Sequence, residues 1–294
     1  MGKKFNCPVC EKQISIKLKS CKFCGADLSV DEIQISKMRE NYKIGMARNL
    51  FQNKDVLGAL NILNETLKEF PQSVSALGWA GAIRLSIGHY QQGFEMFKKL
   101  VSIDPTNSEA WLKIAICHSE FTEYQKTIDA CNTCLKYDPE KCDALVLMGN
   151  SYKFLGNYKS AADCYQRALK INSSHMTAAQ NYIGSVNESG DEILKHQMKE
   201  FLLKEIFKIT PITLPNMEGR GLRFYNFGAI EQKFGDIQFK INLFVQFNQI
   251  PLEQMNAFVI DNQMIVSIEE YPDAFKEFQK AYNVEPITFK RKTN

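Results

Sequence analysis

"ALVLMGNSYKFLGNYKSAADCYQRALKINS", residues Ala144–Ser173, decides the fold, because its pattern recurs upstream in the chain. At a spacing of 34 residues it aligns with AWLKIAICHSEFTEYQKTIDACNTCLKYDP, residues Ala110–Pro139, and with ALGWAGAIRLSIGHYQQGFEMFKKLVSIDP, residues Ala76–Pro105. A weaker copy occupies residues 40–73. Similarity at a fixed period indicates a repeat architecture in which each unit stacks on the next.

The aligned copies share their prolines and a fixed order of large, small and aromatic residues. Pro71, Pro105 and Pro139 lie 34 residues apart. Small residues allow two helices to approach closely, and large ones fill the space between successive pairs. The period therefore predicts two antiparallel helices in each copy. The shared positions are Leu77, Trp111 and Leu145; Gly81, Ala115 and Gly149; Tyr90, Tyr124 and Tyr158; and Phe97, Cys131 and Tyr165.

This 34-residue signature resembles that of the tetratricopeptide repeat (TPR) family. The resemblance implies a mainly α fold in which a helical solenoid of four repeats covers residues 40–175. A degenerate fifth pair is expected at residues 176–207, where the charged run DEILKHQMKEFLLKEIF suits the capping helix that solenoids need. Residues 29–39 form a connecting segment before the first repeat.

The resemblance also implies that the first helix of each pair lines a concave binding groove. The carboxylate clamp of chaperone-binding family members is missing, because Ile44, Gly78, Leu112 and Val146 occupy the corresponding positions. We therefore expect a mainly apolar groove that suits an amphipathic helix or an extended apolar peptide. The alternative is that the C-terminal part of the chain covers this face. The expected groove residues are Ile44, Arg48, Phe51, Leu85, Leu112, Ile116, Val146, Asn150 and Lys153.

Four of the nine cysteines lie near the N-terminus with the spacing C-x2-C-x10-C-x2-C. Two facing C-x-x-C knuckles give a tetrahedral four-thiolate site, which zinc favours and which iron also accepts. Four protein ligands leave no open coordination position, so the metal is expected to be structural. The ligands are Cys7, Cys10, Cys21 and Cys24. Gly25 follows the last of them and is expected to supply the positive φ that such a knuckle needs.

Residues 1–28 resemble the short zinc ribbons found at the ends of many intracellular proteins. Ile14, Ile16 and Leu18 alternate with polar residues, which predicts a β-hairpin connecting the two knuckles. Six lysines against Glu11 and Asp27 give this segment a charge of +4, whereas the rest of the chain sums to −1. Such lysines serve solubility, or they contact phosphates of a nucleic acid.

The remaining cysteines have a simpler interpretation. Cys131 and Cys134 also form a C-x-x-C pattern, but both fall at packing positions of a repeat helix. There a free cysteine behaves as a small apolar side chain. We therefore predict a structural role for them rather than a redox pair.

The pattern changes in the C-terminal quarter, which is not identified with a known family. Residues 208–221 contain two prolines and two glycines and are expected to form a linker. Alternating apolar residues over 237–247 predict a half-buried strand that forms a hairpin with residues 222–232. Residues 257–268 predict a second hairpin, and residues 272–282 predict a helix. A small α+β domain over residues 222–294 follows, with a turn expected at Asp261 and Asn262.

The sequence predicts a non-enzymatic scaffold or adaptor that binds a protein or peptide partner. Glu231 and Lys233 resemble the E-x-K element of metal-dependent nucleases, but the expected upstream aspartate is missing. The chain has no apolar signal sequence and no run of about 18 apolar residues, so a soluble, cytoplasmic protein with no membrane span is expected. A nucleic-acid-associated protein that uses the basic ribbon is the alternative function, and a nuclease activity in the C-terminal domain is a more distant one.

Overall fold

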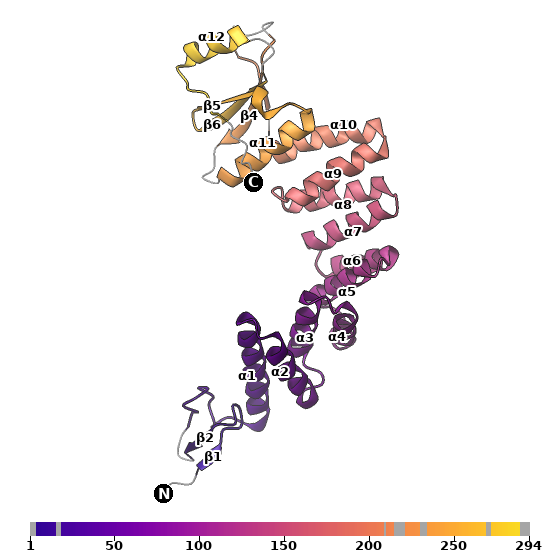
Figure 1. Ribbon diagram of the computed structural model, residues 1–294, viewed down its shortest axis with the longest axis vertical. Coiled ribbons are helices and arrows are strands. Elements are labelled where there is room, and N and C mark those ends of the chain that lie inside the picture. The colour runs from indigo at the N-terminus through magenta and orange to yellow at the C-terminus, as the bar shows by residue number, and fades with distance from the viewer. Residues whose placement is uncertain are drawn as a thin grey trace. The chain divides into compact units, whose positions relative to one another are not determined.

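The computed structural model describes residues 4–15, 19–208, 210–214, 221–229, 234–268 and 272–288. Contacts within the chain group it into two compact units, Met1–Leu147 and Met148–Asn294. The first unit holds the cysteine segment and the first helical pairs (Figure 1), and the second holds the last pairs and the C-terminal domain. The boundary falls inside a repeat helix, so the repeats continue through both units.

The chain opens with two short antiparallel strands, β1 (Lys4–Asn6) and β2 (Gln13–Ser15). They pair with Phe5 opposite Ile14, and they therefore flank the first knuckle. The hairpin expected between the two knuckles rests on Ile14, Ile16 and Leu18, of which the structure describes Ile14 alone, so it stays a prediction. The turn of the first knuckle brings its own two ends together and so lets β1 and β2 pair. Residues 16–18 lie outside the described residues.

The predicted solenoid is confirmed as successive helical pairs. Neighbouring helices pack antiparallel, as the 34-residue period requires, and the caps repeat with it. Ser73 and Asn107 lie one period apart, and each accepts a hydrogen bond from a backbone N–H in the first turn of the following helix. The pairs are α1 (Glu32–Gln52) with α2 (Val56–Glu69), α3 (Val74–Ser86) with α4 (Tyr90–Ile103), α5 (Ser108–Glu120) with α6 (Tyr124–Tyr137), α7 (Cys142–Phe154) with α8 (Tyr158–Ile171), and α9 (Met176–Ser189) with α10 (Glu192–Phe201).

Small and large residues compensate each other inside the pairs. A Cβ added at Gly81 would lie 2.7 Å from the Phe97 ring, and one added at Gly149 would lie 2.7 Å from the Tyr165 ring. In the third repeat the small position holds an alanine, and its counterpart is the smaller Cys131. Glycine is thus found where the partner residue is a large aromatic ring.

The last solenoid helix does not end in a purely polar cap. Helix α10 continues as a single stretch of π-helix, η1 (Leu202–Phe207), whose Leu202, Ile206 and Phe207 are buried. The ring of Phe207 meets the ring of Phe244 edge-on at 6.2 Å between centroids. The C-terminal domain therefore covers this end of the solenoid.

The C-terminal domain is a four-stranded antiparallel sheet in the order β3-β4-β6-β5, with a helix on each face. Strand β4 pairs with β3 and β6, not with residues 237–247 as predicted. The predicted hairpin turn is confirmed, because Asp261 and Asn262 have φ values of 50° and 58°. The predicted helix is also present. The elements are β3 (Thr210–Ile212), β4 (Arg223–Ala229), α11 (Phe234–Asn248), η2 (Leu252–Gln254), β5 (Met255–Ile260), β6 (Gln263–Ile268) and α12 (Pro272–Tyr282).

Aromatic residues of β4 divide the core of this domain between the two faces of the sheet. Phe224 packs on Phe278 of α12, with 4.6 Å between ring centroids. The next residue, Tyr225, points to the opposite face and meets Phe244 of α11 at 5.2 Å. Strand β3 comes from the segment expected to be a linker, so that segment contributes to the sheet.

The period-two pattern of residues 237–247 predicted a strand, and this prediction is wrong because the residues lie in helix α11. In a helix, residues two apart point about 200° apart, so alternate apolar residues form two stripes on nearly opposite sides. Ile241 and Leu243 belong to this alternating set, point about 200° apart and are both buried. The alternation thus marks a helix buried on two sides. Its length is the missed signal, since 11 residues is about twice a usual strand.

Within the described residues, no helix combines the length and the apolar character needed to cross a membrane.

Candidate functional site

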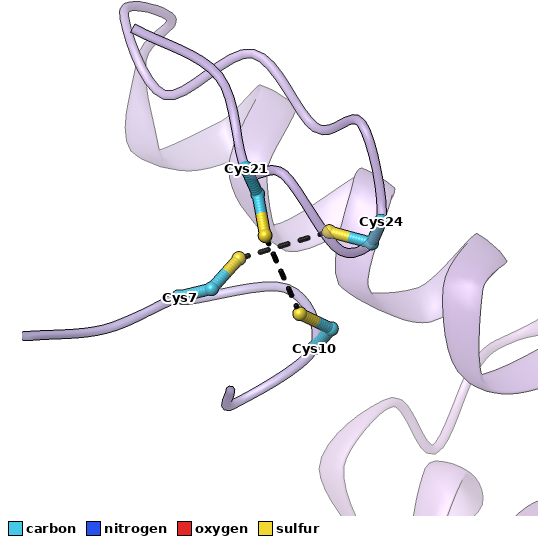
Figure 2. A group of neighbouring side chains, drawn as sticks. All are labelled: Cys7, Cys10, Cys21 and Cys24. Carbon is cyan, nitrogen blue, oxygen red and sulfur yellow. Dashed lines mark hydrogen bonds between the residues drawn. The ribbon is translucent and has the colours of Figure 1, made fainter. Parts of the chain in front are cut away.

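The four predicted ligands converge on one point near the N-terminus (Figure 2). Their sulfur atoms all lie within 4.8 Å of one another. The Cys7 and Cys24 sulfurs are 3.7 Å apart, and those of Cys10 and Cys21 are 3.6 Å apart. A tetrahedron with metal–sulfur bonds of about 2.3 Å has sulfur–sulfur edges of about 3.8 Å, whereas a disulfide needs about 2.05 Å. The spacing therefore fits a metal ion held by four thiolates.

The two knuckles are built alike, which explains how they face each other. The N–H of Val9 donates to the Cys7 sulfur and the N–H of Phe23 donates to the Cys21 sulfur, each at 3.4 Å. Each knuckle then closes at a residue with positive φ, 72° at Gly25 and 62° at Glu11. The expectation for Gly25 is confirmed. The matching conformation at Glu11 was missed, because glutamate gives no such signal in sequence.

Electrostatics of the cluster favour a bound cation. Burial opposes ionisation of Cys21, yet the N–H groups of Cys24 and Phe23 lower its pKa to about 6. Burial raises the pKa of Cys24 to about 12. Four thiolates at this spacing repel one another, so all four ionise together only when a cation lies among them.

The first three turns of α1 hold the ribbon against the solenoid. Ile35, Met38 and Tyr42 pack on the cysteine cluster. Nε of Arg39 donates to the carbonyl of Pro8 in the first knuckle. Helix α1 thus begins at Glu32, before the first repeat, and its start belongs to the ribbon core. The apolar spacing of three and four residues was the available sequence signal.

An ion-pair network then ties this helix to its partner. Nη1 of Arg39 lies 2.7 Å from Oε1 of Glu69, and Nζ of Lys43 lies 2.6 Å from Oε2 of the same carboxylate. Hydrogen bonds from Lys43 and Arg39 lower the pKa of Glu69. One arginine therefore joins a knuckle carbonyl to the last turn of α2.

The basic surface of the ribbon centres on one ring. The Phe23 side chain is 48% exposed. The ammonium groups of Lys22 and Lys12 lie 4.9 and 5.2 Å from its ring centroid. An exposed aromatic face flanked by cations is therefore present beside the metal centre.

The expected groove residues of the N-terminal unit fall into three groups. Ile44, Leu112 and Val146 are buried among the helices, so their side chains offer little surface to a partner. Arg48 is exposed, with its guanidinium 5.1 Å from the ring centroid of Trp79. The half-buried apolar residues are Phe51, Leu85 and Ile116.

In the C-terminal unit, the two expected groove residues have partners within the protein. The side-chain oxygen Oδ1 of Asn150 accepts hydrogen bonds from the Tyr165 hydroxyl at 2.7 Å and from the side-chain amide of Asn181 at 3.0 Å. Nζ of Lys153 lies 3.2 Å from the Glu188 carboxylate. The charge of this lysine is therefore partly neutralised already.

The cysteine pair of the repeats lies in the helical core. Cys131 and Cys134 are fully buried, and burial raises the pKa of Cys134 to about 11. The Cys134 thiol therefore stays protonated, as expected for a packing residue. Glu231 and Lys233, the E-x-K candidates, lie outside the described residues.

Comparisons with known proteins agree with the helical architecture. Residues 142–175 match the tetratricopeptide repeat family model. Tetratricopeptide repeat protein 12 of Homo sapiens is 26% identical over 156 residues, which cover 53% of this chain and 21% of that protein. A probable UDP-N-acetylglucosamine–peptide N-acetylglucosaminyltransferase, SPINDLY of Hordeum vulgare, is 25% identical over 137 residues, 44% of this chain and 14% of that protein. The matched part thus spans about a fifth of these relatives or less.

Solved structures show the same fold. A crystal structure of MamA superposes with a TM-score of 0.52 at 22% identity and covers 60% of this chain and 98% of MamA. At this identity the likeness concerns the fold alone. The helical pairs of this chain are therefore tetratricopeptide repeats, preceded in sequence by a four-cysteine cluster and followed by a C-terminal domain of sheet and helices.

Proposed function

We propose that this protein is a non-enzymatic scaffold that binds a protein or peptide partner on the faces of α1, α3 and α5. The observation that carries the proposal is the mixture of side chains there. Phe51, Leu85 and Ile116 keep part of their apolar surface accessible, and Arg48 stands exposed over Trp79. An amphipathic helix with an acidic flank matches such a surface.

A structural zinc ion completes the proposed protein. Its support is the four-thiolate donor set, whose spacing matches tetrahedral coordination. All nine cysteines are free thiols, which agrees with the reducing cytoplasm as its location. Elemental analysis of the purified protein is expected to give one zinc per chain, and the variant Cys24→Ser is expected to lose it. One iron per chain would reject zinc in favour of the alternative metal.

Partner binding is tested with charge reversals that spare the core. Arg48→Glu changes an exposed residue of α1, and Lys98→Glu makes the same charge change on the exposed surface of α4. We expect Arg48→Glu to reduce recovery of the wild-type partner at least fivefold, whereas Lys98→Glu leaves it unchanged. Equal recovery by both variants would remove the proposed face from consideration.

Nucleic-acid binding by the ribbon is the second candidate, favoured by Phe23 and its two flanking lysines. An aromatic ring stacks on unpaired bases, and lysines contact phosphates. Fluorescence anisotropy with a single-stranded oligonucleotide tests it. Affinity that falls steeply with salt and is lost in Lys22→Glu supports this function, and absence of binding at low salt rejects it.

A further inference from the structure

A cavity of about 390 Å³ lies in the C-terminal unit, where the last solenoid pair meets the end of α11. Its volume falls in the range of small-ligand pockets. None of the expected groove residues and none of the cysteines lines it. The lining residues are Ile183 and Asn187 from α9, Lys195, Met198 and Lys199 from α10, and Gln246, Phe247, Asn248 and Gln249 at the end of α11.

The charged side chains of the lining are both lysines. Nζ of Lys195 lies 2.6 Å from Glu192, a carboxylate on the same helix that is itself 81% exposed. Lys199 differs, because no carboxylate of the described residues lies within ion-pair distance of its ammonium group. The ammonium lies instead 5.9 Å from the ring centroid of Phe247. The cavity thus presents an exposed ammonium group that has no ion-pair partner among the described residues.

The rest of the lining combines amide groups with an apolar floor. Met198 is almost fully buried, Ile183 is 7% exposed, and Phe247 is half-buried beside them. Gln246 and Gln249 bring side-chain amides to the rim.

We propose that this cavity binds a carboxylate joined to an apolar group, as in the C-terminal residue of a peptide with an aliphatic side chain. The carboxylate ion-pairs with Lys199 and accepts hydrogen bonds from the rim amides. The aliphatic group covers the accessible part of the Phe247 ring and displaces water from it. This site goes beyond the scaffold function proposed above, because it shares no residue with the faces of α1, α3 and α5.

The test uses the full chain and a defined probe, the peptide acetyl-Ala-Ala-Leu with a free carboxylate. Its amide serves as the matched probe that lacks the negative charge. Titrations followed by ¹H–¹⁵N chemical shifts are expected to perturb Lys199, Phe247 and Gln249. The amide is expected to bind at least tenfold more weakly than the acid.

Two charge reversals separate the cavity from general electrostatics. Lys199→Glu is expected to lower the affinity for the peptide acid at least tenfold. Lys204 is an exposed lysine outside the lining, and Lys204→Glu is expected to change this affinity less than twofold. Equal affinity for acid and amide in the wild type would overturn the proposal, whatever the variants do. So would a peptide acid that leaves the cavity resonances unperturbed at its solubility limit.

Partner binding by α1, α3 and α5 is measured separately and is unaffected by either outcome. If 4-methylpentanoate binds as tightly as the peptide acid, the carboxylate site stands and the ligand is a small free acid.

Discussion

At the scale of single residues, two of the repeats pair a glycine with a large aromatic ring. Gly149 faces the Tyr165 ring and Gly81 faces the Phe97 ring, each with no room for a methyl group. Gly45 of α1, by contrast, has no heavy atom within 4 Å of its ideal Cβ position. Glycine is thus required where a ring leaves no room for a methyl group, whereas at Gly45 a larger residue would also fit.

Alanine substitution distinguishes these glycines. We expect Gly149→Ala to lower the free energy of unfolding by about 1–3 kcal/mol, because the new methyl group overlaps the tyrosine ring. Gly45→Ala is expected to raise it by about 0.5–1 kcal/mol, because alanine stabilises an exposed helix. Urea unfolding followed by circular dichroism measures both. Stabilisation by both substitutions would mean that the helix pair is looser than described.

Residue patterns predicted that the four cysteines cluster, because the spacing of a knuckle is local. They did not predict that Ile44, Leu112 and Val146 are buried. Positions carried over from a family name a face of a helix, whereas burial also depends on how closely the neighbouring helices pack. Arg48 and Ile116 are therefore better probes of partner binding.

At the scale of elements, the ribbon and the first helical pair behave as one structure. Arg39 contacts the carbonyl of Pro8 and the carboxylate of Glu69, and Lys43 contacts the same carboxylate. Stability of the first pair is therefore expected to depend on this carboxylate and on its charge.

A pH series on Glu69→Gln tests that dependence. The lysine and arginine lower the pKa of Glu69 below its ordinary 4.5, so its contribution to stability is complete above that pH and is lost as the pH falls through the lower folded value. We expect the free energy of unfolding of the wild type to exceed that of Glu69→Gln by roughly 0.5–1 kcal/mol between pH 5 and 7. This difference is expected to shrink below pH 4.5. Protonation of the cysteine thiolates at low pH affects the stability of both proteins alike, so it cancels in the difference between them. A difference that grows on acidification would contradict the network.

The C-terminal elements show where sequence patterns mislead. Alternating apolar residues mark a strand when one face is buried, yet in α11 they mark a helix with two buried sides. Burial decides between these cases: Ile241 and Leu243 point about 200° apart on α11, and both are buried. The hairpin at Asp261 and Asn262 was predictable, because positive φ at two successive residues is a local demand that these residue types meet.

At the scale of the whole molecule, the period of 34 residues was enough to predict the solenoid. The cavity beside Lys199 was not predictable, because three segments that are separate in sequence line it. Its cation became visible only when the positions of the acidic side chains were known. The repeats thus fix the scaffold, and the segment that follows them in the chain contributes the less predictable site.

The central claim is that partners bind on the faces of α1, α3 and α5. Hydrogen–deuterium exchange of the complex with the partner recovered by the wild-type protein tests it most directly. The account predicts slower exchange in these three helices on binding, with α2, α4 and α6 unchanged. Protection confined to α2, α4 and α6, or to the C-terminal domain, would contradict it.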